Sequence, residues 1–449
     1  MASLICRICI MTLLLSLAGC APPETAPEDQ ALDPERLVLK IDKEVSIIEP
    51  GHETGLAHEM VGMVRHPDGT IYVNTMTQGT GEALGFFKST DQGETWEPVR
   101  LNLSDAAPGQ RLIGLGVTRD GRLWLLHQST SKELFVSWSA DVETWNTTPI
   151  DFRPLGSRGM EYPLVHSYND YNTFIEQPDG TLMFSVGLRY DRDYYKDPKN
   201  RIDGLMRPDL DFGGEMIFRS TDGGKTWGDV TMMHPHVTEV GHALDPFDPN
   251  RILSMTRTQR ELLAGEDREA TIRRTGAPSD MPSDLPSIYK NGLLMGSTDG
   301  GRTFHEVPGG LTEFYGHRAT IVWGSNNVVV VAANFNRKNS SRVLRVSLDG
   351  GRTWVDGTAE GTREFNQAKK FPLLTPPLTV SFTSPMLELS PNHFMSVYAY
   401  WENESLKRYY KAPKNPCPQG TEVGDCPWLG LRAVFWHLEN APPEPAEAG

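Results

Sequence analysis

Alternating apolar and polar residues recur along the chain as pairs of short strands joined by a tight turn. In residues 60–75, for example, apolar positions alternate on both sides of the turn sequence His66-Pro67-Asp68-Gly69. Alternation with a period of two is typical of a half-buried β-strand, and Pro, Asp and Gly favour turns. Six such hairpins occur, at residues 60–75, 112–127, 172–189, 242–257, 319–336 and 385–401. The pattern predicts an all-β protein built from six similar units.

A turn motif, S-x-D-x-G-x-T-W, follows each of the first five hairpins. Four copies occupy residues 89–96, 220–227, 297–304 and 347–354, of which the third ends in Phe304 instead of Trp, and a shorter copy without the glycine occupies residues 139–145. In such a turn we expect the Asp to accept hydrogen bonds from N–H groups, the Gly to adopt a positive φ, and the aromatic residue to pack on the sheet. We therefore assign this motif a structural role.

The repeat lengths are long enough for four-stranded blades and predict a six-bladed β-propeller over residues 37–440. The sixth hairpin lacks the turn motif and is followed by one more apolar segment, residues 431–438. We expect the early strand 36–48 to complete that last blade, because closing the ring removes unpaired sheet edges. Three insertions leave the outer ends of hairpins and are expected to share one face; they are residues 190–213, 258–288 and 402–430.

The N-terminus has the pattern of an export signal over residues 1–19. Arg7 precedes a short apolar segment that is too short to span a bilayer as a permanent helix. The segment ends in Leu17-Ala18-Gly19-Cys20, which resembles the lipobox of bacterial lipoproteins. This resemblance implies lipid modification of Cys20 and a location in the cell envelope, periplasmic or at the cell surface; an ordinary cleaved signal peptide is the alternative.

Residues 20–36 are rich in Pro, Glu and Ala and predict a disordered tether, and residues 441–449 predict a disordered tail. Three of the five cysteines lie in the export segment. Because an exported compartment permits disulfides, we expect the other two, Cys417 and Cys426, to pair with each other.

The net charge of the chain is −15. Nucleic-acid binding needs clustered Lys and Arg, so we expect no nucleic-acid partner, although a local group of arginines can still bind an acidic glycan. His234 and His236 lie close together, but two histidines in a loop are more often solvated than metal ligands. We predict a monomer with no metal and no cofactor.

Charged, imidazole and phenol side chains precede the apolar strand that opens most hairpins. These residues are His58, Glu59, Arg111, Asp170, Tyr171, Glu239, His242, His317 and Arg318. The second strands of the hairpins end with Arg189, Arg257, Tyr398 and Trp401. In a propeller the first strand of each blade borders the central channel, so the two sets predict one polar pocket. The alternative is that they are solvated strand ends or ion pairs.

The turn motif and its spacing resemble those of the sialidase superfamily over nearly the whole mature chain. The resemblance implies that Glu239 and Arg257 match the family's Glu and second Arg, and that Arg318 matches its third Arg. Other positions depart from the family. Glu59 stands where the first Arg is expected, and Phe382 and Thr383 stand where the nucleophilic Tyr is expected. The family's acid/base Asp is expected within residues 74–88, but the only carboxylate there is Glu82.

We therefore expect an exo-acting glycoside hydrolase that binds an anionic or deoxy-sugar glycan and is not a strict sialidase. Glu59, Asp170 and Glu239 are its candidate catalytic carboxylates, because glycoside hydrolysis uses two carboxyl groups across a pocket. The other named residues are candidate substrate ligands. Two alternatives remain: a lyase of the same fold, in which Arg neutralises a uronate and His or Tyr moves protons, and a non-catalytic propeller that binds glycan or protein.

Overall fold

The computed structural model describes residues 31–442 except for 49–58, 77–85, 102, 104–110, 129–132, 151–163, 169–173, 191–214, 235–236, 259–266, 268–290, 313–318, 335–341, 359, 375–378, 382–384 and 402–429. The described residues form β-strands and turns, with one short 3-10 helix, η3 (Phe365–Gln367). Within this part of the chain, no helix has the length and apolar character of a membrane span.

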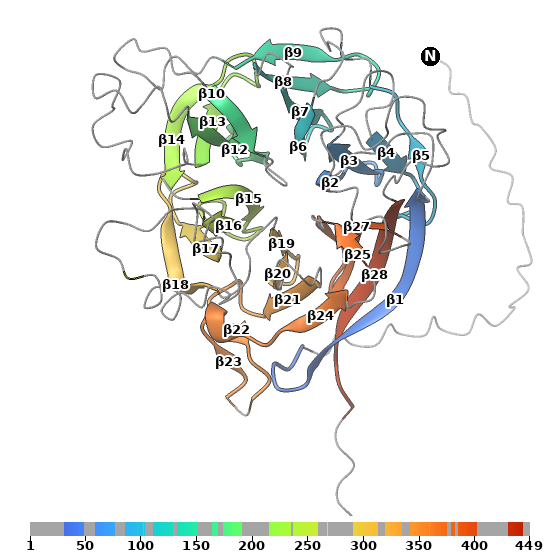
Figure 1. The fold of residues 1–449 in the computed structure, drawn as a ribbon, viewed down its shortest axis with the longest axis vertical. Coiled ribbons are helices and arrows are strands. Elements are labelled where there is room, and N and C mark those ends of the chain that lie inside the picture. The colour runs from blue at the N-terminus through green and yellow to red at the C-terminus, as the bar shows by residue number, and fades with distance from the viewer. Residues whose placement is uncertain are drawn as a thin grey trace, which may run out of the picture.

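The strands form six antiparallel sheets arranged around a central axis (Figure 1). Blade one contains β2 (Glu59–Arg65), β3 (Ile71–Met76), β4 (Phe86–Ser89) and β5 (Glu97–Pro98). Blade two contains β6 (Arg111–Val117), β7 (Leu123–Gln128), β8 (Leu134–Ser139) and β9 (Asn146–Pro149). Blade three contains β10 (Leu164–Tyr168), β11 (Ile175–Glu176), β12 (Leu182–Tyr190), β13 (Glu215–Ser220) and β14 (Gly228–His234).

Blade four contains β15 (Val237–Leu244), β16 (Ile252–Thr258), β17 (Gly292–Ser297) and β18 (His305–Leu311). Blade five contains β19 (Thr320–Trp323), β20 (Val329–Asn334), β21 (Arg342–Ser347) and β24 (Phe371–Leu374), with a side hairpin of β22 (Trp354–Val355) and β23 (Thr362–Arg363). Blade six contains β25 (Thr379–Ser381), β26 (Met386–Ser390), β27 (His393–Trp401), β28 (Gly430–Asn440) and β1 (Leu37–Ile48). The predicted six-bladed β-propeller is confirmed.

The ring is closed by the earliest strand, as the sequence predicted. β1 pairs antiparallel with β28, so that Leu37 lies opposite Asn440 and Ile48 lies opposite Leu431. β1 is the outermost strand of this blade and carries the exposed charged residues Lys40, Asp42 and Lys43. Charges along an outer strand hinder pairing with another chain. Closure therefore joins the two ends of the propeller in one sheet and leaves a protected edge.

The strand directions place similar features of all blades on common faces. In each blade the first strand runs to a tight turn and the second returns, and in blades one to five the third ends at the position of the S-x-D-x-G-x-T-W motif. We call the face with these turns the turn face. The opposite face, where the first strands begin and the second strands end, is called the entry face. The three predicted insertions lie largely outside the described residues, but the strands they follow, β12, β16 and β27, all end at the entry face.

The repeated turns have the hydrogen bonds expected from their sequence. In blade one, the backbone N–H and the hydroxyl of Thr95 donate to Asp91 at 2.9 and 2.5 Å, and the Ser89 hydroxyl donates to the same carboxylate at 2.8 Å. The Thr95 hydroxyl, the Thr95 N–H and the Ser89 hydroxyl lower the pKa of Asp91 to about 2, because each stabilises the carboxylate. The equivalent aspartates of the other turns are Asp141, Asp222, Asp299 and Asp349.

The glycine of each complete turn also has a contact that the motif alone does not predict. A Cβ on Gly224 would lie 2.2 Å from the indole of Trp124 in blade two. A Cβ on Gly301 would lie 2.8 Å from Met183 in blade three, and Gly351 packs in the same way on Leu253 in blade four. Each turn therefore rests directly on the preceding blade, and only glycine allows this approach.

The hydrophobic core is divided into clusters that lie between neighbouring blades. Between blades two and three, Trp124 packs with Phe184, Phe218 and Trp227, all of which are at most 9% exposed. The rings of Phe184 and Phe218 stack with centroids 5.0 Å apart, and Trp227 meets Phe184 edge-on at 4.8 Å. Trp227 is the aromatic residue of a repeated turn, so this turn is anchored in the core as predicted.

The first strands of blades three and six differ from the prediction. We expected each to begin just before its hairpin, but each consists of two pieces, β10 with β11 and β25 with β26. Asp170 and Tyr171 therefore follow the first piece of the strand and do not precede the whole strand. Phe382 and Thr383 fall between the two pieces in blade six in the same way. The apolar alternation was too short in β10 and β25 to identify them as strands.

Candidate active site

A buried ion pair lies at the entry face of blade four, where β15 begins and β16 ends. Thr238 of β15 pairs with Arg257 of β16, and Glu239 is the next residue. Nη2 of Arg257 lies 2.8 Å from Oε1 of Glu239. Glu239 is 5% exposed and Arg257 is 3% exposed. At this burial, removing one partner leaves the other charge poorly solvated, so the two residues stabilise each other strongly.

The backbone of Glu239 has an unusual conformation. Its φ is +57°, in the left-handed region that residues other than Gly, Asn and Asp rarely adopt. The strand pairing shifts between Thr238 and Gly241, which marks a β-bulge at this point. A bulge changes the direction of a side chain, and a left-handed residue other than Gly costs about 1–3 kcal/mol. The fold thus places the Glu239 carboxylate against Arg257 at a cost in backbone energy, which is common at functional sites.

Bulges recur at the same point in other blades. The pairing also shifts between Met60 and Gly62 in β2, between Leu112 and Gly114 in β6, and between Leu164 and His166 in β10. The first strands of blades one to four therefore share a distortion close to their entry-face ends. Such shared bulges are typical of strands that direct side chains toward a common site.

His242, three residues after Glu239 on β15, connects blades three and four. Its Nδ1 lies 2.7 Å from Oγ of Ser254 in β16, and its Nε2 lies 2.8 Å from Oγ of Ser185 in β12. Burial lowers the pKa of His242 to about 4, so the imidazole is neutral at neutral pH. Both ring nitrogens contact hydroxyl groups of the protein, and the residue positions β15 beside β12.

A second buried carboxylate belongs to Glu215, which the sequence did not identify as a site residue. Glu215 begins β13 at the entry face and is fully buried. Side chains alternate along a strand, so Glu215 shares a face with Ile217, and Ile217 belongs to the same buried cluster as Val237 and Val240 of β15. Glu215 therefore faces blade four, the blade of Glu239. The signal available in the sequence was a single acidic residue at the start of the apolar segment Glu215–Ser220.

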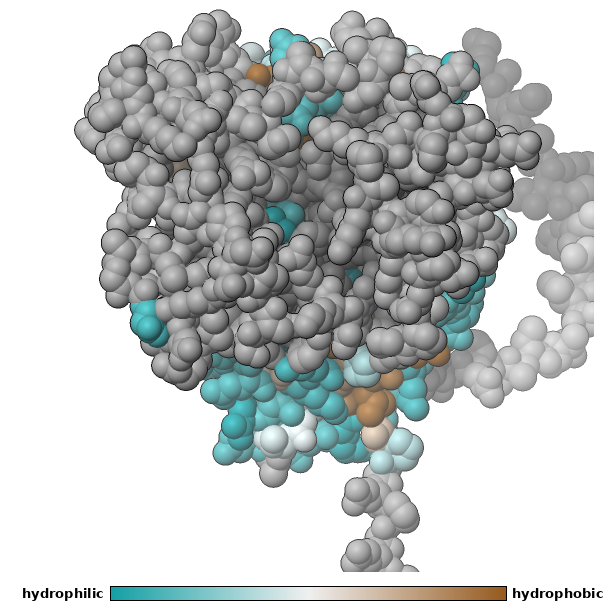
Figure 2. All heavy atoms as spheres, viewed as in Figure 1, coloured by the Kyte–Doolittle hydropathy of each residue, from teal (hydrophilic) through white to brown (hydrophobic). Residues whose placement is uncertain are grey.

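The backbone positions of several predicted site residues also lie at the entry face. Glu59 and Arg111 begin β2 and β6, Arg189 lies in β12 opposite His166, and Trp401 ends β27. Their side chains are outside the described part of the structure. His58, Asp170, Tyr171, His317 and Arg318 lie entirely outside it, as do Cys20, Cys417 and Cys426. Figure 2 shows hydrophilic described residues in the hollow at the centre of the molecule.

Tyr398 has a different environment from the Glu239–Arg257 pair. It is fully buried in the cluster between blades five and six, and its hydroxyl donates to Oε2 of Glu44 in β1 at 2.8 Å. Burial and the hydrogen bond to Glu44 raise its pKa. The structure gives Tyr398 a packing role, because its side chain crosses the sheet toward the outermost strand.

Among the described residues, no three or more His, Cys, Asp or Glu side chains form a cluster that could hold a metal ion. Among the described residues, the charged centre of the site is the Glu239–Arg257 pair, and the neutral His242 follows Glu239 by three residues on the same strand. Such a centre can orient a carboxylate for proton transfer or nucleophilic attack and can place a positive charge near an anionic ligand.

No protein-family model matches this sequence, and no curated protein matches it. Solved structures do match. A protein of unknown function from Dyadobacter fermentans DSM 18053 is 15% identical with a TM-score of 0.54, over 89% of this chain and 99% of that chain. A Hadza microbial sialidase is 17% identical with a TM-score of 0.52, over 79% of this chain and 66% of that chain. An intramolecular trans-sialidase from Ruminococcus gnavus is 11% identical with a TM-score of 0.51, over 88% and 97%. At these identities the likeness establishes the fold: this chain is a six-bladed propeller like those of sialidases.

Proposed function

We propose that the protein is an exo-acting glycoside hydrolase for an anionic or deoxy-sugar glycan and that it is not a strict sialidase. The observation that supports this most is the Glu239–Arg257 pair at the entry face. Propeller structures of similar fold include a sialidase and a trans-sialidase. Glycosidases need carboxyl groups held in a defined orientation, and the bulge at Glu239 and the contact with Arg257 hold one at the entry face.

Arg257 and Glu239 have complementary roles in this proposal. The guanidinium stabilises the negative charge of the Glu239 carboxylate and fixes its direction. A positive charge at this point also favours a substrate with a carboxylate or another anionic substituent. The second carboxylate that hydrolysis requires comes from Glu59 or Asp170, which the sequence predicts for the same face, or from Glu215 on the neighbouring blade.

A panel of aryl glycosides and natural oligosaccharides tests this proposal, with released sugar as the measurement. Glu239→Gln preserves the size of the side chain, removes the charge and should lower kcat by at least about 10²-fold. Glu143→Gln is the matched control, because Glu143 is exposed on the turn face and should leave activity unchanged. Equal turnover by Glu239→Gln and the parent would remove Glu239 from the mechanism.

The same panel separates the two other functions. A lyase would form an unsaturated product that absorbs in the ultraviolet and contains no oxygen from water. A binding protein would retain the glycan without releasing sugar, and Arg257→Gln would then weaken binding. Hydrolysis with incorporation of ¹⁸O from labelled water supports the glycosidase.

We also propose that the chain is exported and anchored through a lipid on Cys20, because residues 1–20 combine a short apolar segment with a lipobox-like ending. Metabolic labelling with a fatty-acid analogue should modify the parent and not the variant Cys20→Ala. The disulfide between Cys417 and Cys426 and the monomeric state remain predictions; intact mass before and after reduction tests the first and light scattering the second.

A further inference from the structure

The segment that leads into β1 is fixed against the other end of the propeller chain. The N–H of Asp33 donates to Oδ1 of Asn440 at 2.7 Å, and the amide of Asn440 donates to the carbonyl of Ala31 at 3.1 Å. Nε of Arg36 donates to the carbonyl of Ala441 at 3.0 Å. These contacts tie residues 31–36 to the end of β28 and to Ala441 after it, so the point where the N-terminal tether joins the fold is defined.

Blade five adds a second support for this junction. Leu32 packs against the core cluster that contains Leu37 and Phe371. Nζ of Lys369 donates to the carbonyl of Leu37 at 3.3 Å. The side hairpin of blade five approaches the same segment, because a Cβ on Gly361 would lie 3.2 Å from the ring of Pro34. Figure 1 shows β22 and β23 beside the start of β1.

The register of blade six places this junction at the turn-face end. Leu37 lies opposite Asn440, and the N–H of Leu438 donates to the carbonyl of Asn392 in the turn between β26 and β27. The opposite end of β1, Ile48, lies with Leu431 near the start of β28. Glu239 and Arg257 also belong to that opposite end, because β15 begins there and β16 ends there. The tether and the ion pair therefore lie on opposite faces.

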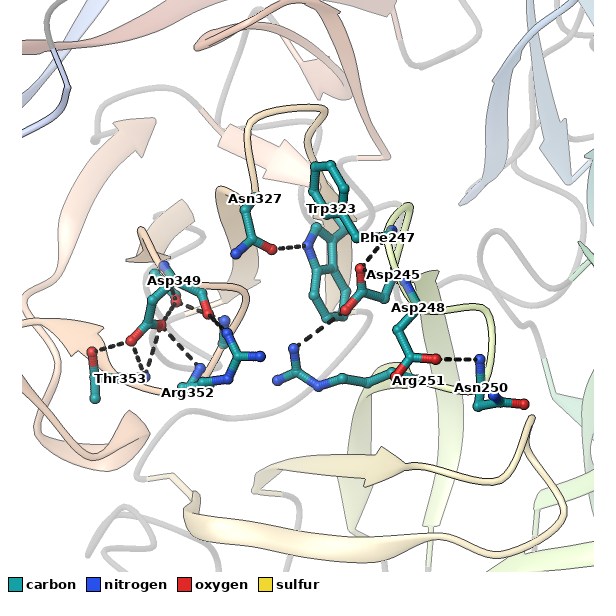
Figure 3. Close-up of polar contacts among 12 residues, drawn as sticks. Asp245, Phe247, Asp248, Asn250, Arg251, Trp323, Asn327, Asp349, Arg352 and Thr353 are labelled. Carbon is teal, nitrogen blue, oxygen red and sulfur yellow. Dashed lines mark hydrogen bonds and ion pairs between the residues drawn. The ribbon is translucent and has the colours of Figure 1, made fainter.

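The turn face is a packed polar surface. At blade four, Arg251 Nη1 lies 3.4 Å from Oδ2 of Asp245, and its guanidinium stacks 4.8 Å from the ring of Trp323 in blade five (Figure 3). Phe247 projects from the same turn and is 64% exposed. The repeated turns add charges of both signs to this face, for example Asp299 and Arg302 in blade four. Charged and polar groups can face hydrated lipid headgroups, and the tether length limits how far this face can lie from the membrane.

We propose that the propeller stands on the lipid surface with its turn face toward the bilayer and its Glu239–Arg257 end directed away from it. This orientation rests on the proposed lipid anchor at Cys20. Ten residues, 21–30, separate Cys20 from Ala31, and a fully extended chain of that length spans about 40 Å at most. The junction thus stays close to the bilayer, and the entry face opens toward glycans in the surrounding medium and away from headgroups of the anchoring membrane.

Energy transfer to the bilayer tests the orientation. Lipidated full-length protein is bound to vesicles that contain an acceptor dye on the lipid headgroup. A fluorescent amino acid is introduced genetically at Phe247 on the turn face or at Glu133, which precedes β8 on the entry face and is exposed. The strands separate these positions by about 20 Å. Transfer from position 247 should therefore be several-fold stronger than transfer from position 133.

Three outcomes would overturn the proposal. Equal transfer from the two positions would mean that the propeller has no preferred orientation, and stronger transfer from position 133 would mean that the entry face points to the bilayer. Protein with an intact Cys20 that stays off the vesicles would remove the anchor and the orientation with it. Cys20→Ala should give no transfer from either position. Glycan turnover is measured separately in detergent, so loss of the proposed hydrolase activity is distinguished from loss of the orientation.

Discussion

Nε2 of His242 lies 2.8 Å from the hydroxyl oxygen of Ser185, and this buried contact links blade four to blade three. The other ring nitrogen contacts Ser254, so the imidazole is surrounded by hydroxyl groups and is neutral. The residue lies three positions after Glu239 on the same strand. The position of the candidate carboxylate is therefore coupled to the packing of two blades.

The burial of two histidines makes stability depend on pH. Burial lowers the pKa of both His242 and His127 to about 4, whereas an unfolded histidine titrates near 6.5. Between these values the unfolded chain binds protons that the folded protein does not. The free energy of unfolding should therefore fall as pH drops from about 6.5 to 4, by up to about 1.4 kcal/mol per pH unit for each residue. Urea denaturation at several pH values measures this.

His242→Gln should flatten that pH dependence, although the variant should be less stable than the parent at pH 7 because it loses a buried hydrogen bond. His305→Gln is the control, since His305 is exposed in β18 and should leave the slope unchanged. An unaltered slope in His242→Gln would show that other groups produce the acid sensitivity.

Gly224→Ala should destabilise the protein strongly. The φ of Gly224 is +86°, and a Cβ would lie 2.2 Å from Trp124. Backbone strain and overpacking together should cost about 2–4 kcal/mol. Gly228→Ala is a matched control, because a Cβ there meets no atom within 4 Å. Thermal unfolding of the two variants should give clearly separate midpoints; equal midpoints would argue against the contact between blades.

Tyr398→Phe should reduce stability without affecting the site. The variant loses the hydrogen bond from the Tyr398 hydroxyl to Glu44, which should cost about 1–3 kcal/mol because the acceptor is a carboxylate. Glycan affinity and turnover should stay at parental values, since the side chain lies in the core between blades five and six. A large rise in KM with unchanged stability would restore Tyr398 as a substrate ligand.

Leu37→Ala should weaken closure of the ring. Leu37 is fully buried at the start of β1, and removing its methyl groups should cost about 2–4 kcal/mol. Ile41→Ala in the same strand is the control, because Ile41 is 48% exposed and the change should stay within about 0.5 kcal/mol. Denaturant midpoints distinguish the two; similar losses would show that β1 contributes through pairing alone.

The sequence by itself determined the blade count, the closing strand and the local chemistry of the turns. These features depend on period-two alternation and on short-range hydrogen bonds such as those from Thr95 to Asp91, which neighbouring residues settle on their own. The two-piece first strands of blades three and six escaped prediction, because β10 and β25 are short and pair only through partners distant in sequence.

The tertiary structure alone decided which polar residues meet. Glu239 and Arg257 were predicted together, but the left-handed backbone and the bulge that join them arise from strand register. Tyr398 and His242 carried the same sequence signal as the site residues, yet one reaches across its sheet to Glu44 and the other across blades to Ser185. Glu215 carried almost no signal and is buried facing blade four. Alternation along a strand predicts which face of the sheet a side chain projects from. Contacts between residues far apart in the chain decide which blade, hydroxyl or carboxylate the side chain then contacts.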